Sequence, residues 1–169
     1  MFRIPNAVEA YWSQQDYHRP TAVDIARLAD LIGAPLPLSY VDFITRYGFV
    51  SFDDIPGMQR RFDYFVFPSD GEVGRREIRF LLEPCRIMKA HEICTRAQSD
   101  DDEDFPKFPA KFLPVGNDAG QGLILIEFGE YPGRIWFWRE NEWAWGMGDN
   151  TWLGFVANDF QDFIDRLQV

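Results

Sequence analysis

The sequence contains no apolar run of the roughly 18 to 20 residues that a membrane-spanning helix needs. Its opening, MFRIPNAVEAYWSQQD, also lacks the apolar core and the small-residue cleavage site of a secretory signal. Cysteine is scarce too. Cys85 and Cys94 fall in one expected helix, where their Cα atoms would lie roughly 13 Å apart, too far for a disulfide. These absences predict a cytoplasmic protein with reduced thiols and no membrane contact.

Basic residues are in deficit. The 169-residue chain has 17 Lys and Arg against 27 Asp and Glu, which gives a net charge of −10 and a pI near 4.6. This balance argues against binding to nucleic acid, because phosphates require a basic surface. It is compatible with a basic protein partner, which a negative field would attract. The alternative is that the charge only keeps the protein soluble.

Catalytic and metal-binding patterns are also few. There are two histidines, His18 and His91, and HEICT is not a HExxH zinc motif because Thr95 replaces the second histidine. A Cys94 nucleophile with His91 as its base is chemically conceivable, but an apolar helix face favours a structural cysteine. The sequence therefore predicts no catalytic residue, no metal site and no cofactor.

The segment GNDAGQG, residues 116–122, raises the question of a phosphate-binding loop. Such a loop needs a Lys and a hydroxyl residue after its last glycine, followed by a helix. Here the strand-like LILIEF follows Gly122, and the segment carries Asp118, which would repel phosphate. We predict a turn between two strands, in which the glycines and Asn117 adopt positive φ.

The run of five acids after residue 99 resembles the start of a calcium loop. Phe105 stands where that loop needs glycine, and Lys111 stands where it needs glutamate. A solvated loop is therefore one interpretation, and an electrostatic contact for a basic partner is the other.

What the sequence has in abundance is aromatic surface, with 16 Phe, 6 Trp and 6 Tyr. Strand alternation places Trp136 and Trp138 on one face of a strand, with Ile135 and Phe137 on the other. Trp143 and Trp145 share a face of the next expected strand. At least one pair is expected to pack in the core, and an exposed pair would be a candidate binding surface.

Periodicity predicts an α+β fold, with a mostly antiparallel sheet and helices at both chain ends. We expect a single domain, with an N-terminal extension over 1–20, a core over 21–168 and an acidic loop near 99–106. Helices are expected in NAVEAYWSQQ, in TAVDIARLADLIG with a Thr21–Asp24 cap, after Pro37, over 83–98, and after a cap at Asn158. Strands are expected at 61–67 and 76–82, and in KFLPVG, GLILIEF, GRIWFWR and EWAWGM.

Several motifs together resemble the SUKH superfamily, the cell-wall-assembly-regulator-like proteins. They are IARLADLIGAPLPLSYVDFITRYG, FLPVGNDAGQGLILIEF, RIWFWRENEW and VANDFQDFI, in that order. Glu127 takes the place of the family's acidic residue after the second strand. The residues that match the family motifs are Gly33, Pro37, Tyr40, Phe43, Gly48, Pro114, Gly116, Asn117, Asp118, Gly122, Trp138, Phe160 and Phe163.

The resemblance implies a domain without catalytic residues that binds another protein. In bacteria the family is associated with immunity proteins that neutralise toxins, frequently nucleases, and in fungi with regulatory scaffolds. A basic toxin domain is the expected partner, with a scaffold role as the alternative. A small hydrolase or transferase that uses the acidic loop or the Cys94–His91 pair is the alternative from another class. The expected partner-binding residues are Asp100, Asp101, Asp102, Glu103, Asp104, Trp143 and Trp145.

Overall fold

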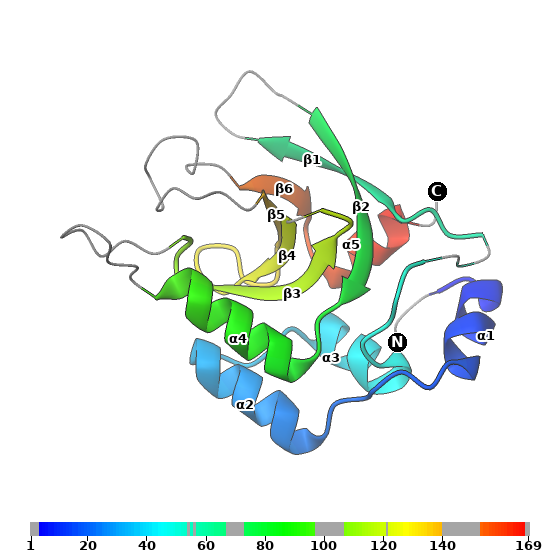
Figure 1. The fold of residues 1–169 in the computed structure, drawn as a ribbon, viewed down its shortest axis with the longest axis horizontal. Helices are drawn as coiled ribbons and strands as arrows, with labels where there is room; N and C mark the ends of the chain where they lie inside the picture. Colours follow the sequence, from blue (N-terminus) through cyan, green and yellow to red (C-terminus); the bar gives the residue numbers. More distant parts are fainter. Residues whose placement is uncertain are drawn as a thin grey trace.

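The computed structural model describes residues 4–53, 55, 57–66, 73–96, 107–120, 122–139 and 153–167. These residues form five helices and six strands (Figure 1). The helices are α1 (Asn6–Gln14), α2 (Ala22–Ile32), α3 (Leu38–Tyr47), α4 (Pro84–Thr95) and α5 (Phe160–Arg166). The strands are β1 (Arg61–Val66), β2 (Val73–Leu81), β3 (Phe112–Asp118), β4 (Gly122–Glu127), β5 (Ile135–Arg139) and β6 (Gly154–Ala157). No helix in these ranges is long and apolar enough to cross a membrane.

The six strands form a closed antiparallel barrel in chain order, β1 to β6. Closure comes from β6, whose Phe155 and Gly154 pair with Phe65 and Val66 of β1. The α+β class, the antiparallel pairing and the helices at both ends are confirmed. The sequence had not indicated β6 or the closure, and the expected strand EWAWGM lies outside the described residues.

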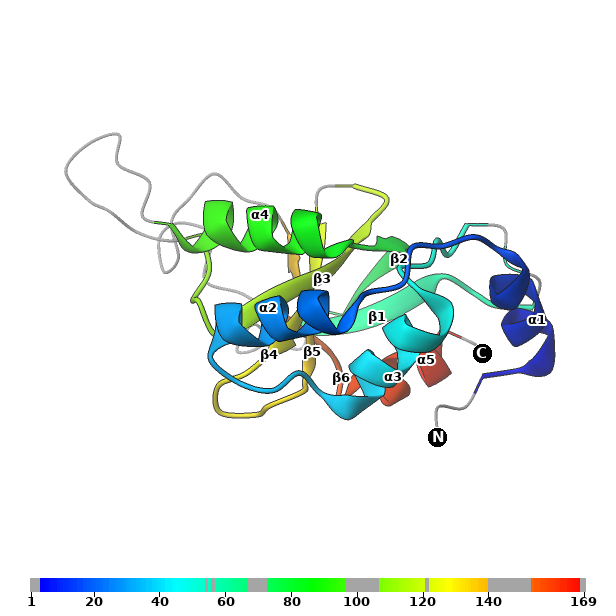
Figure 2. The same ribbon diagram turned by 90° about the horizontal axis from the view of Figure 1, so that it is seen from below.

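The helices pack around this barrel in two groups. α2 and α4 lie side by side, and α4 also contacts β3 (Figures 1 and 2). α3 contacts α5, which in turn contacts β6. α1 lies farther from the barrel, beside the chain that leads into α2 (Figure 2).

Local sequence signals set most helix ends. The Thr21 side chain accepts a hydrogen bond from the Asp24 backbone N–H, and Asp24 accepts from the Thr21 backbone, which completes the predicted capping box. Gly33 ends α2 with φ 71°, the left-handed conformation that glycine adopts without cost. At the start of α5 the prediction was wrong by one residue: Asp159, not Asn158, is the N-cap and accepts from the Asp162 N–H.

The main core fills the barrel and the space beneath α3 and α5. Tyr40 and Phe43 of α3 stack edge-on against Phe160 of α5, at ring-centroid distances of 5.1 and 5.3 Å. The expected N-terminal extension contributes to the same core, since Trp12 of α1 is fully buried and lies 5.2 Å from the ring of Phe43. Burial of an aromatic ring of this size contributes on the order of 2 to 3 kcal/mol, so α1 is an integral part of the packing.

The predicted alternation in β5 is confirmed. Ile135 and Phe137 belong to the main core, whereas Trp138 is buried in a second cluster outside the barrel with Phe108, Phe112 and Leu125. The indole of Trp138 meets Phe108 edge-on at 5.4 Å. This second cluster covers the outer face of β4 and β5.

Candidate functional site

The turn between β3 and β4 is organised by one buried carboxylate. Asp118, whose exposed fraction is 5%, accepts hydrogen bonds on Oδ1 from the backbone N–H groups of Gly120 and Gly122, both at 2.8 Å. Charge-assisted bonds of this length offset the cost of removing a carboxylate from water. The expected turn is therefore confirmed, and Asp118 is the residue that shapes it.

The expected reason for the glycines in this turn was wrong. Gly116, Gly120 and Gly122 do not adopt positive φ. Gly122 is instead required by packing, because a Cβ at this position would overlap the ring of Phe137 inside the barrel. Phe137 therefore occupies the volume that a side chain at residue 122 would fill.

Strand β2 carries charges on both of its faces. The outward-facing Arg75 donates to Asp63 at 2.7 Å, and the outward-facing Glu77 pairs with Arg60 at 2.9 Å and Arg61 at 3.1 Å. The hydrogen bond from Arg75 holds the pKa of Asp63 below its ordinary value, and the hydrogen bond from Arg61 does the same for Glu77. These outer charges are therefore compensated within the hairpin.

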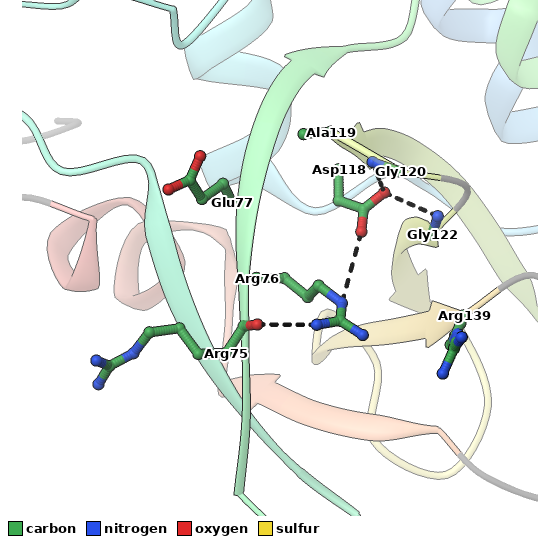
Figure 3. Close-up of a pocket in the computed structure, with 8 residues that line it drawn as sticks. All are labelled: Arg75, Arg76, Glu77, Asp118, Ala119, Gly120, Gly122 and Arg139. Atoms are coloured by element: carbon green, nitrogen blue, oxygen red, sulfur yellow. Dashed lines mark hydrogen bonds and ion pairs between the residues drawn. The ribbon is translucent and has the colours of Figure 1, made fainter.

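Arg76 lies between Arg75 and Glu77 in β2, and its side chain points the other way, toward the mouth of the barrel (Figure 3). It is the register partner of the buried Phe62, so both side chains lie on the inner face of the sheet. Its Nε atom lies 3.9 Å from Asp118 Oδ2, and its Nη1 atom donates to the Arg75 carbonyl at 3.2 Å. The remaining donors of this guanidinium face the open end of the barrel.

A cavity of about 540 Å³ occupies this open end. It is lined by Arg75, Arg76, Glu77, Asp118, Ala119, Gly120, Gly122 and Arg139 (Figure 3). Arg139 comes from the end of β5, two residues after the interior Phe137, and its side chain is exposed. We call this cavity the barrel mouth. It combines two inward-facing arginines with one buried carboxylate.

A second buried carboxylate lies at the end of β4. Glu127, with an exposed fraction of 2%, accepts from Trp136 Nε1 at 2.9 Å and from the Tyr131 backbone N–H at 3.3 Å, and Lys111 Nζ lies 3.6 Å away. The residue that matches the family's acidic position thus ties the β4–β5 turn to the sheet. Its oxygens are occupied by the fold, which indicates a structural role.

The conceivable Cys94–His91 pair is part of the scaffold. The His91 Nε2–H donates to the Ala110 carbonyl at 3.0 Å, and the Cys94 carbonyl accepts from the backbone N–H groups of Lys107 and Phe108 at 2.7 and 3.2 Å. Both residues therefore attach the end of α4 to the segment that enters β3. Cys85 and Cys94 are free thiols, as expected. Within the described ranges no three His, Cys, Asp or Glu side chains are placed to hold a metal ion.

The residues expected to bind a partner, Asp100, Asp101, Asp102, Glu103, Asp104, Trp143 and Trp145, all lie outside the described residues. The family-motif residues have well-defined structural places. Tyr40, Phe43, Phe160, Phe163 and Trp138 are buried. Gly33 and Gly48 end α2 and α3, Pro37 caps α3, and Pro114, Gly116, Asn117, Asp118 and Gly122 lie in the β3–β4 hairpin.

Charge is unevenly divided along the chain. The described residues contain 16 Lys and Arg and 16 Asp and Glu, so the folded body that they form is electrically neutral. The whole excess of −10 resides in the remaining residues, which hold 11 acids and one arginine. The net charge of the whole chain does not reveal this division. It also does not reveal the barrel mouth, where the inward-facing arginines outnumber the inward-facing carboxylate.

Sequence reasoning did not single out Arg76 or Arg139. The two are 63 positions apart in the sequence, and strand pairing is what brings them to one opening. The available signal was alternation: Arg76 shares a strand face with the buried Ile78, and Arg139 shares one with the buried Phe137. When alternate positions of a strand are apolar and face inward, a charged residue at the next alternate position indicates where the barrel interior ends.

The family model described as the SMI1 / KNR4 family (SUKH-1) matches residues 19–166. This match covers most of the chain and includes every motif on which the sequence resemblance rested. Helix α1 lies before it. No curated protein matches the sequence closely enough to count as a relative.

Proposed function

Because the chain belongs to the SMI1 / KNR4 family (SUKH-1), we propose that it is a non-catalytic protein-binding domain, and specifically an immunity protein that binds and neutralises a bacterial toxin in the cytoplasm. The family match over residues 19–166 is the observation that carries this proposal. The mechanism is occlusion: the bound domain covers the toxin's active surface, and no bond chemistry is involved.

The acidic balance supports a basic toxin domain as the partner, such as a nuclease. A nuclease active surface is built to attract phosphates, and a protein with a net charge of −10 would present negative charge to it. The excess acids belong to segments other than the neutral described ranges, so the long-range attraction would come from those segments. We propose that residues 100–104 contribute to it.

The test is a binding and protection experiment with candidate toxin domains encoded by the genes that neighbour this one. We expect a nanomolar complex at low salt that weakens as salt is added, together with survival of cells that express both proteins. Binding should also raise the melting temperature of the domain with partner concentration. Capture of a housekeeping assembly, without binding to the adjacent toxin, would contradict the immunity role and support a scaffold.

A cysteine variant separates binding from enzymology. Cys94→Ala leaves the backbone contacts of α4 in place, so toxin binding and protection should be unchanged. Loss of a measurable hydrolase or transferase activity in this variant would instead favour the enzyme alternative.

A further inference from the structure

The barrel mouth has the features of an anion site that the proposed function does not yet use. Arg76 and Arg139 both continue inward-facing strand positions and reach the same cavity. Arg139 forms no ion pair with any other described residue, and Arg76 pairs with Asp118 only at 3.9 Å, beyond hydrogen-bond distance. Two guanidinium groups therefore keep donors directed at an open space of about 540 Å³.

The charges of the described residues leave a small positive excess in the barrel mouth. Arg75 and Glu77 line it mainly with backbone, because their side chains point to the opposite face of β2, where Asp63 and Arg60 neutralise them (Figure 3). Asp118 is held by two backbone N–H groups and cancels only one of the two remaining cations. Among the described residues that line the barrel mouth, the balance is thus about one positive charge.

This balance selects the class of ligand. A carboxylate carries one negative charge and accepts two parallel N–H bonds from a guanidinium, which fits the barrel mouth in charge and geometry. A phosphate monoester, at about −1.5 to −2, would bring excess negative charge next to the buried Asp118. The side chain of Arg76 is 38% exposed and Arg139 is exposed, so the site is open enough for a group attached to a large molecule.

We propose that the barrel mouth is a recognition pocket for a carboxylate of the protein partner, an Asp or Glu side chain or a chain terminus held by Arg76 and Arg139. The partner's identity rests on the proposed function, but the pocket itself does not. The negative net charge would attract a basic partner at long range. The barrel mouth would add a short-range requirement for a negatively charged group on that partner. A partner without a carboxylate at this point would leave two desolvated arginines unpaired, which penalises the wrong partner.

The pocket can be tested on the protein alone, with acetate as the probe. The backbone amides of Gly120 and Gly122 and the Nε–H of Arg76 would be followed by NMR during titration with sodium acetate, against sodium chloride at equal ionic strength. We expect saturable shifts with a Kd on the order of 10 mM. Arg76→Gln and Arg139→Gln should each weaken acetate binding by about tenfold, the loss of roughly one charge-assisted bond.

Arg75→Gln is the matched control, because it removes the same charge from the adjacent position of the same strand but on the outer face. It should leave acetate binding unchanged. If Arg76→Gln does not fold, the exposed Arg139→Gln still tests the pocket. The absence of saturable shifts in the wild type, or tighter binding of inorganic phosphate than of acetate, would overturn the proposal.

Once a toxin partner is in hand, the same variants extend the test. Arg76→Gln and Arg139→Gln should raise the dissociation rate of the complex about tenfold, whereas Arg75→Gln should not. Acetate binding without any toxin complex would contradict the proposed function and leave the pocket standing. A toxin complex that is indifferent to both inner arginines would contradict the pocket's role and leave the immunity function standing.

Discussion

At the residue scale, two glycines of one turn have different reasons to be glycine. A Cβ on Gly120 would lie 3.4 Å from Asp118 Oδ1, an ordinary contact, whereas a Cβ on Gly122 would overlap the Phe137 ring. Neither residue has positive φ, so backbone conformation does not distinguish them. Substitutions at the two positions can therefore distinguish a steric requirement inside the barrel from a requirement of the turn geometry.

Gly122→Ala should lower the free energy of unfolding by about 1 to 3 kcal/mol, because an added methyl group must displace a buried aromatic ring. Gly120→Ala, two residues earlier in the same turn, should change it by less than about 0.5 kcal/mol. Urea unfolding followed by tryptophan fluorescence measures both. Equal losses in the two variants would mean that the turn, and not the Phe137 contact, requires glycine.

At the element scale, what could be predicted from sequence depended on how local the signal was. The Thr21–Asp24 box and Gly33 lie at the two ends of the helix that they delimit, so α2 was predicted with both ends. β6 is only four residues long, and its place is set by pairing with β1 and β5 rather than by its own pattern. Barrel closure and the arginine pair depend on such distant pairings, which explains why neither was predicted.

The short helix α5 depends on an acidic residue near its start. Burial raises the pKa of Asp162, but the hydrogen bonds from Arg166 and the Asn158 backbone, together with the Arg166 charge, outweigh it, so the net shift is downward. Asp162 accepts from Arg166 at 2.9 and 3.0 Å and from the Asn158 N–H at 2.9 Å. Because the folded pKa lies below the unfolded value, this stabilisation is complete above about pH 4 and is lost as the pH falls through the folded pKa.

Asp162→Asn should therefore lower the free energy of unfolding by about 1 kcal/mol at pH 7, a loss typical of helix-start contacts. At pH 3 the difference from the wild type should shrink, because the wild-type carboxyl group is then becoming protonated. Asp165→Asn, in the same helix, is the control with the same charge change. Thermal unfolding across pH 2.5 to 7 measures all three proteins, and a difference that does not vary with pH would refute the ionic contribution of Asp162.

At the scale of the whole molecule, charge is unevenly divided along the chain. The described residues are neutral in sum, with 16 basic and 16 acidic side chains, but those that line the barrel mouth have a local positive excess. Long-range attraction depends on net charge, whereas short-range fit depends on the few groups that are desolvated at the contact. The negative segments and the barrel mouth would therefore act at different stages of binding, the first on the association rate and the second on the dissociation rate.

If the negative segments act on the association rate alone, the position of the acids should matter as well as their number. Replacing Asp100, Asp101, Asp102 and Asp104 by Asn should slow association with a basic toxin domain about tenfold at low salt and flatten its salt dependence. The dissociation rate should change by less than about twofold, because long-range charges act mainly on encounter.

The control replaces four exposed acids of the folded body, Asp16, Asp30, Asp42 and Glu92, by their amides, which gives the same net charge. Stopped-flow measurements at two salt concentrations give both rates. If the two four-residue variants slow association equally, the position of the acidic run is irrelevant and only the total charge attracts the partner. If the 100–104 variant alone is slow, the partner approaches through that segment. An unchanged association rate in both variants would remove electrostatic attraction from the mechanism and leave recognition to the folded body.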